Sequence, residues 1–166
     1  VIEDCAHAFG SKYKNKPIGA HGNYATFSFQ AIKHLTSVDG GMLICPHRKQ
    51  YKRARILRWY GIDRDDNRNV NASIGLTNLK EVDKEVISKH KSNANYYNNT
   101  LKDVEGITLL ENKEGFDSSY WIYTLKVERQ DDFMKMMQEK DIMVSRVHER
   151  NDKHTCVQDF RCSLPN

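Results

Sequence analysis

The sequence predicts an α/β fold in the first part of the chain and a smaller α+β unit in the second. Three observations carry this prediction. Short apolar strands alternate with helices at the start, a polar loop at 63–71 interrupts the alternation, and a long amphipathic helix follows that loop. We therefore expect two domains, one at 1–68 and a second at 69–166, made of the long helix and a small C-terminal α+β domain.

The first part is predicted from short β-prone runs separated by glycines, and from one helical pattern. In chain order, the expected elements are a strand at 1–4, a turn or short helix at 6–10, a surface hairpin at 13–18, an aromatic strand at 25–29, a buried strand at 41–45 and a basic helix at 49–60. Such an alternation is typical of a parallel sheet that is covered on both faces.

The second part opens with the clearest helical pattern in the chain. Apolar residues recur at steps of three or four over about 28 residues, a length that can link two domains. The members of this stripe are Leu76, Leu79, Val82, Val86, Ala94, Tyr97 and Leu101. The elements expected after it are strands at 106–110, 121–127 and 142–147 and a helix at 131–140. Together they form an α+β unit.

Composition and charge exclude several classes of protein. Apolar residues make up 39% and charged residues 29%, which is typical of a globular domain. The 26 basic and 22 acidic residues are interspersed, whereas a nucleic-acid footprint needs a concentrated basic face. No apolar run approaches the roughly 18 residues of a membrane helix. We therefore expect neither a nucleic-acid partner nor a membrane partner.

The four cysteines give the expected compartment. Cys5, Cys45, Cys156 and Cys162 form no CxxC pair and show no zinc spacing. Free thiols are typical of a reducing cytosol. We therefore expect a cytoplasmic protein without a metal site.

Lys33 and Asp4 are the first candidates for chemistry, because each follows or ends a β-prone run. A lysine just past a buried strand becomes a nucleophilic amine when desolvation removes part of its charge. Pyridoxal phosphate requires an amine for a Schiff base and a carboxylate for its pyridinium nitrogen. A lone lysine after a strand is most often a solvated surface residue, and a lone aspartate a helix cap. The two residues by themselves leave the choice open.

Five segments carry a resemblance that bears on this choice. They are residues 1–8, 27–36, 57–64, 71–76 and 145–152. Together and in this order they resemble the DegT/DnrJ/EryC1/StrS family of sugar aminotransferases, which have the aspartate-aminotransferase-type fold. The resemblance covers nearly the whole chain. It is closest to perosamine-synthase-like members, which aminate nucleotide-linked 4-keto-6-deoxy sugars.

The resemblance implies roles for four residues around the cofactor. Lys33 would hold pyridoxal phosphate as a Schiff base and move the proton during transamination. Asp4 would pair with the pyridinium nitrogen, which makes the cofactor ring an electron sink. His7 stands where many relatives have glutamine, a donor close to the ring, and Ser28 would donate to the cofactor phosphate.

The implied function is transfer of an amino group from an amino acid, expected to be glutamate, to a nucleotide-linked keto-deoxy sugar for polysaccharide or lipopolysaccharide synthesis. The full-length protein would be a homodimer. His148 and Arg150 belong to a segment that approaches the sugar site in relatives. One alternative is a sugar dehydratase of the same family, but those have histidine in place of Lys33. Another is a catalytically inactive, truncated family fold that serves as an interaction protein.

Three departures from the family pattern qualify these expectations. The chain opens inside a strand, so we expect a fragment without the N-terminal segments that stack on the cofactor ring and bind its phosphate. The stretch at 68–71 is shorter than in relatives and offers no equivalent of an asparagine that reaches the partner subunit's cofactor. Val38 stands where relatives commonly have glycine, and a β-branched residue disfavours positive φ, so the turn after Lys33 is expected to differ. The chain alone is expected to bind pyridoxal phosphate weakly or not at all.

Overall fold

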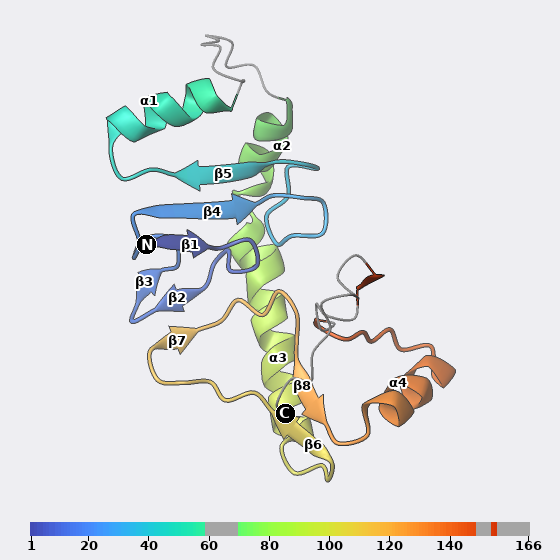
Figure 1. Ribbon diagram of the computed structural model, residues 1–166. Coiled ribbons are helices and arrows are strands. Elements are labelled where there is room, and N and C mark those ends of the chain that lie inside the picture. Colours follow the sequence, from blue (N-terminus) through green and yellow to red (C-terminus); the bar gives the residue numbers. More distant parts are fainter. Residues whose placement is uncertain (59–69, 149–153, 156–166) are drawn as a thin grey trace. The chain divides into compact units, whose positions relative to one another are not determined.

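A computed structural model describes residues 1–58, 70–148 and 154–155 of the 166-residue chain (Figure 1). The chain divides into two compact units. Unit 1 comprises Val1–Lys102 and Glu111–Tyr123, and unit 2 comprises Asp103–Leu110 and Thr124–Asn166. The predicted domain boundary near residue 68 lies outside the described residues and stays a prediction.

Unit 1 contains a three-stranded sheet with the order β1-β4-β5 (Figure 1). Strand β1 is Ile2–Asp4, β4 is Tyr24–Ser28 and β5 is Gly41–Ile44. Strands β1 and β4 run parallel, with Asp4 opposite Thr26, and β5 runs antiparallel to β4. All three strands were predicted. The parallel pair brings the carboxyl ends of β1 and β4 to the same edge of the sheet.

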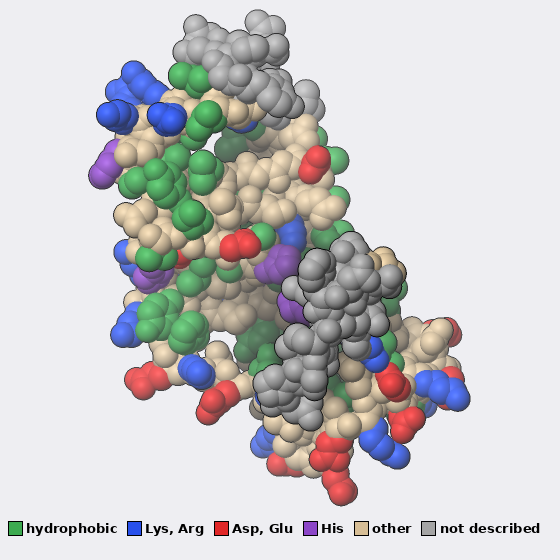
Figure 2. Space-filling model, in the orientation of Figure 1, with side chains coloured by type: hydrophobic (Ala, Val, Ile, Leu, Met, Phe, Trp, Pro, Cys, Tyr) green, Lys and Arg blue, Asp and Glu red, His purple; other side chains and the backbone are tan. Residues whose placement is uncertain are grey.

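Strand β5 is exposed, so the prediction of a buried strand at 41–45 was wrong. Met42, Leu43 and Ile44 are 43%, 45% and 38% exposed. The strand is at the edge of its sheet, and helix α1 (Arg48–Leu57) has no buried residue. Figure 2 shows the basic side chains that gather along α1. The described elements therefore leave the apolar side chains of β5 in contact with water.

A second small sheet carries the predicted hairpin. Strands β2 (Lys12–Tyr13) and β3 (Lys16–Pro17) are antiparallel, and β7 (Phe116–Asp117) pairs with β2. Lys14 and Asn15 both have positive φ, at 48° and 62°, as a two-residue turn between twisted strands requires. The strand β7 was not predicted, because its partner lies about a hundred residues earlier in the sequence.

Glu3 fixes the loop that follows this hairpin. Its Oε2 accepts the amide N–H of Gly19 at 2.8 Å, and its Oε1 accepts those of His21, at 2.8 Å, and Gly22. Hydrogen bonds to the ionised carboxylate, the Gly19 amide first, lower the pKa of Glu3. The charged carboxylate therefore joins β1 to the loop.

The predicted long helix is three segments rather than one. Helix α2 (Val70–Asn78) ends in a turn, and a π-helical segment η1 (Val82–Ile87) leads into α3 (Ser88–Leu101). In a π-helix the hydrogen bonds join residues five apart, so two residues five apart lie more nearly on the same face than they would in an α-helix. Val82 and Ile87, five apart, are both buried in the core with Leu35. The π segment thus allows both residues to pack.

Unit 2 is a small α+β arrangement. Strands β6 (Ile107–Leu109) and β8 (Leu125–Val127) are antiparallel, and helix α4 (Gln130–Glu139) follows β8. The strand predicted at 121–127 begins only at Leu125, and the strand predicted at 142–147 does not form. The amide of Ile142 bonds to the carbonyl oxygen of Met137 at 2.9 Å. The segment after α4 therefore begins by folding back on the helix instead of joining a ladder.

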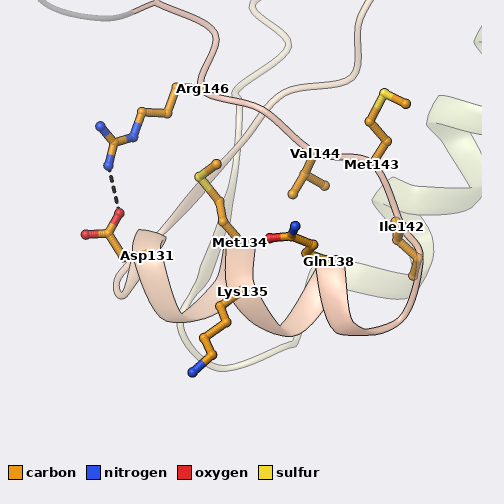
Figure 3. Close-up of a pocket in the computed structure, with 8 residues that line it drawn as sticks. All are labelled: Asp131, Met134, Lys135, Gln138, Ile142, Met143, Val144 and Arg146. Atoms are coloured by element: carbon orange, nitrogen blue, oxygen red, sulfur yellow. Dashed lines mark hydrogen bonds and ion pairs between the residues drawn. The ribbon is translucent and has the colours of Figure 1, made fainter.

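Helix α4 and residues 142–146 border an open groove of about 520 Å³ (Figure 3). Met134, Gln138 and Val144 line it, and the guanidinium of Arg146 forms an ion pair with Asp131 at 2.7 Å. Both ionic groups are partly or largely exposed, so the pair contributes little to stability. None of the helices in the described part of the chain is long and apolar enough to cross a membrane.

Candidate cofactor site

The carboxyl edge of the parallel strands β1 and β4 collects three of the predicted site residues. Asp4 is the last residue of β1 and Ser28 is the last residue of β4. Lys33 follows five residues later, in the loop that connects β4 to β5. In α/β sheets, ligand-binding side chains are usually found at this edge.

The loop that carries Lys33 is held by hydrogen bonds at both ends. The amide of Lys33 bonds to the carbonyl of Gln30 at 3.0 Å, and the amide of Ser37 bonds to the carbonyl of Phe29 at 2.9 Å. From helix α2, the side-chain amide of Asn78 donates to the carbonyl of Thr36 at 2.8 Å. The backbone around the lysine is therefore fixed, while the lysine side chain is only partly buried.

Trp121 lies against both Lys33 and His7. The Nζ of Lys33 is 4.1 Å from the centroid of the Trp121 ring, and the His7 ring is stacked on the indole with a centroid distance of 3.9 Å. The indole N–H donates to the carbonyl oxygen of Ile32 at 2.9 Å. The structure thus brings two predicted site residues to one aromatic side chain. Sequence reasoning missed Trp121, because it placed this residue inside a regular strand at 121–127.

Asp4 and Ser28 are available for the roles that the resemblance implies. One carboxylate oxygen of Asp4 accepts the amide N–H of Ala6 at 3.1 Å, and the carboxylate is exposed at the strand end. A carboxylate has about four acceptor positions, so capacity remains for a ring N–H. Ser28 Oγ accepts the amide of Gln30 at 3.5 Å, which leaves its O–H to donate. An amine, a carboxylate, a hydroxyl and an aromatic ring at one edge fit pyridoxal phosphate.

Val38 takes a positive φ of 72° in the turn after Lys33. A change in this turn was expected because a β-branched residue disfavours that conformation. The valine is nevertheless in the left-handed region, and its amide donates to Thr36 Oγ1 at 2.9 Å. The turn therefore stores strain of roughly 1–2 kcal/mol.

His34, next to the lysine, is buried against His90. The two rings meet edge to face with centroids 4.5 Å apart, and the Nε2 of His34 is buried without a hydrogen-bond partner in the described structure. Burial first, and then repulsion from His90, lower the pKa of His34. His90 Nδ1 lies 2.8 Å from the carbonyl oxygen of Tyr120. The neutral form of His34 is therefore the one that suits the packed loop.

The structure says little about the two residues that were predicted to contact the sugar. His148 is exposed in unit 2, and Arg150 lies outside the described residues. Their role stays a prediction. Within the ranges that the structure describes, no group of three His, Cys, Asp or Glu side chains could hold a metal ion.

The profile of the DegT/DnrJ/EryC1/StrS aminotransferase family matches residues 1–159. The chain belongs to this family. Among curated relatives, GDP-perosamine synthase from Escherichia coli O157:H7 is 33% identical over 137 residues, which are 75% of this chain and 37% of that protein. The erythromycin biosynthesis sensory transduction protein EryC1 from Saccharopolyspora erythraea is 31% identical over 142 residues, 79% of this chain and 38% of that protein.

Two solved structures match the fold closely. AtS13 from Actinomadura melliaura is 41% identical with a TM-score of 0.89, and 99% of this chain covers 48% of that one. The sugar aminotransferase CalS13 from Micromonospora echinospora is 36% identical with a TM-score of 0.88, and 99% of this chain covers 49% of that one. The predicted family and fold class are confirmed. The chain spans about half the length of these structures.

Proposed function

We propose that this chain is part of a pyridoxal-phosphate-dependent aminotransferase that moves an amino group from an amino acid, glutamate, to a ketone of a nucleotide-linked deoxy sugar. The product would serve polysaccharide or lipopolysaccharide synthesis in the cytoplasm, and the enzyme would act as a homodimer. One observation carries the proposal. Lys33 follows the carboxyl end of β4, whose parallel neighbour β1 ends in Asp4.

In this proposal Lys33 is the covalent attachment point and the proton carrier. When bound, pyridoxal phosphate supplies the aldehyde that receives the amino group and a ring that accepts electron density. The Nζ of Lys33 takes the α-proton of the amino-acid donor and returns a proton to the former ketone carbon of the sugar. Because the backbone of its loop is fixed at both ends, only the lysine side chain needs to move.

The other residues orient and charge the ring. Asp4, fixed by the Ala6 amide, places a carboxylate to pair with the protonated ring nitrogen. Ser28 would donate its hydroxyl hydrogen to a phosphate oxygen of the cofactor. His7 offers a ring nitrogen at the position where many relatives have the amide of glutamine, while His148 and Arg150 would contact the sugar.

A half-reaction with the amino-acid donor tests this proposal. The natural polypeptide that contains this sequence is loaded with pyridoxal phosphate and then mixed with glutamate, while the absorbance of the cofactor is recorded. Aminotransfer predicts conversion of the cofactor to its pyridoxamine form with release of 2-oxoglutarate. Lys33→Ala should abolish the conversion, whereas Lys16→Ala, a change in the hairpin, should leave it unchanged.

Two other results would point to the alternatives. A loaded enzyme that dehydrates a nucleotide-linked keto sugar without forming the pyridoxamine form from glutamate would be a dehydratase. A natural polypeptide that assembles normally but takes up no cofactor would be an interaction protein built on the family fold.

A further inference from the structure

Trp121 is tied to the peptide that immediately precedes Lys33. Its Nε1–H bonds to the carbonyl oxygen of Ile32, which belongs to the peptide bond between Ile32 and Lys33. The same indole is 4.1 Å from the Nζ of Lys33. A cation at this distance over an indole is attracted by the ring quadrupole. One side chain therefore contacts both the backbone and the terminal nitrogen of the lysine region.

Several contacts fix the backbone of the turn that precedes Trp121. Tyr120 has a positive φ of 50°, an uncommon conformation for a residue with a bulky side chain. Its amide donates to Ser118 Oγ at 3.1 Å, and its carbonyl oxygen is 2.8 Å from His90 Nδ1. Such a conformation persists only where the surroundings enforce it, and it is typical of functional sites.

A buried pair of hydroxyl groups secures the same turn to the hairpin region. Ser119 is fully buried, its amide donates to Ser11 Oγ at 3.0 Å, and the two hydroxyl oxygens are 2.9 Å apart. Nearby, β7 pairs with β2. The indole of Trp121 is thus placed by contacts from the hairpin region, from α3 and from the loop of Lys33.

We propose that Trp121 is the positioning residue of Lys33. Its indole restricts the Lys33 side chain to one orientation at the carboxyl edge of β1 and β4. In this orientation the amine would meet the aldehyde carbon of pyridoxal phosphate. This inference rests on the proposed function. In the reaction with that aldehyde, the ammonium of Lys33 first loses a proton to solvent. The neutral amine then forms a C=N bond to the carbon, and the aldehyde oxygen leaves as water with the two hydrogens of the amine.

The first test measures the contact without cofactor. Protons that lie over an indole ring shift upfield in NMR spectra because of the ring current. In the natural polypeptide with 13C-labelled lysines, the ε-CH2 protons of Lys33, assigned with Lys33→Arg, should lie upfield of those of other lysines. Trp121→Leu should remove this shift, Trp121→Phe should keep part of it, and Tyr123→Phe should keep all of it.

The second test measures the rate at which pyridoxal phosphate becomes attached to Lys33, by stopped-flow absorbance. The free energy of a cation–π contact at a partly exposed site corresponds to about a two- to tenfold change in the population of the side-chain orientation that the contact favours. We expect the rate to fall by about that factor in Trp121→Leu and by less in Trp121→Phe, which keeps a ring but loses the N–H. Tyr123→Phe, a change two residues away that removes a bond to Asn98, is the matched control and should react at the wild-type rate.

The outcomes separate this inference from the proposed function. Attachment to Lys33 at the wild-type rate in a folded Trp121→Leu variant would overturn the role of Trp121 and leave the function intact. If the wild-type protein forms no bond between Lys33 and the cofactor, the proposed function fails. In that case the NMR experiment alone tests whether Trp121 positions the amine. An ε-CH2 chemical shift of Lys33 equal to that of the other lysines would refute this role of Trp121. Circular dichroism of each variant shows that it is folded.

Discussion

Asp4 at the end of β1 is the register partner of Thr26 in the parallel strand β4. The carboxyl ends of two parallel strands lie at the same edge of a sheet. This one pairing therefore brings Asp4, Ser28 and the loop of Lys33 to a common edge. An antiparallel pairing of the same two strands would have brought Asp4 to the start of β4. The register of two short strands therefore decides whether the carboxylate and the amine can serve one cofactor.

Val38→Gly should stabilise the protein by about 0.5–1 kcal/mol. Relief of the left-handed conformation gains roughly 1–2 kcal/mol, and the greater freedom of glycine in the unfolded chain removes roughly 0.5–1 kcal/mol. Urea denaturation measures the change. Val104→Gly is the matched control, because Val104 is exposed and does not have positive φ. It should lose about 0.5–1 kcal/mol. Equal destabilisation by both substitutions would show that the Val38 turn is not strained.

Glu3→Gln should make the protein less stable at neutral pH and less sensitive to acid. The pKa of Glu3 is lowered in the folded state, chiefly by the Gly19 amide, from an ordinary value of 4.5. Its contribution is therefore complete above pH 4.5 and is lost as pH falls through the lowered pKa. Denaturant midpoints at pH 7 and pH 3 should differ more in the wild type than in Glu3→Gln. Glu114→Gln, a change at an exposed position, should keep the wild-type pH dependence.

Ser11→Ala should cost about 1–3 kcal/mol of stability, because it removes the acceptor for the buried Ser119 amide and a partner for its hydroxyl. Ser119→Ala should cost less, since Ser11 Oγ still accepts that amide. The double variant should lose less than the sum of the two. Thermal denaturation of the four proteins checks the cycle, and strictly additive losses would mean that the two hydroxyl groups do not interact.

His34 should make stability fall on mild acidification. Its pKa is lowered in the folded state, first by burial and then by His90, from an ordinary value of 6.5. Its contribution is therefore complete above pH 6.5 and is lost as pH falls through the lowered pKa. His34→Gln should flatten the pH profile of the denaturation midpoint below pH 7, whereas His148→Gln, a change at an exposed histidine, should not. An unchanged profile in His34→Gln would contradict the burial of an uncharged ring.

Local sequence patterns predicted the elements whose cause is local. The strand at Ile2–Asp4, the hairpin around Lys14 and Asn15, and helix α4 follow from residue preferences within a few positions. The pairing of β7 with β2 and the hydrogen bond from Trp121 to Ile32, 89 residues apart, depend on how distant segments meet. A single sequence carries no signal for such contacts. The π segment at Val82–Ile87 was missed because its residues also fit an α-helical stripe.

The candidate site shows the same division. Lys33 and Asp4 were candidates because each follows or ends a β-prone run, and the family resemblance supplied the roles of His7 and Ser28. Trp121 became visible only in three dimensions. Trp121 was predicted only as the first residue of a strand at 121–127, with no role of its own. In the structure Trp121 follows Tyr120, which has positive φ, and its indole lies 4.1 Å from the Nζ of Lys33.

The attachment site of pyridoxal phosphate tests the central claim most directly. The natural polypeptide is incubated with pyridoxal phosphate, reduced with borohydride and digested, and the modified peptides are identified by mass spectrometry. We predict that the label is on Lys33, that Lys33→Ala abolishes it, and that Lys16→Ala leaves it unchanged. A label on another lysine, or undiminished labelling of Lys33→Ala, would contradict the assignment of Lys33 as the cofactor lysine.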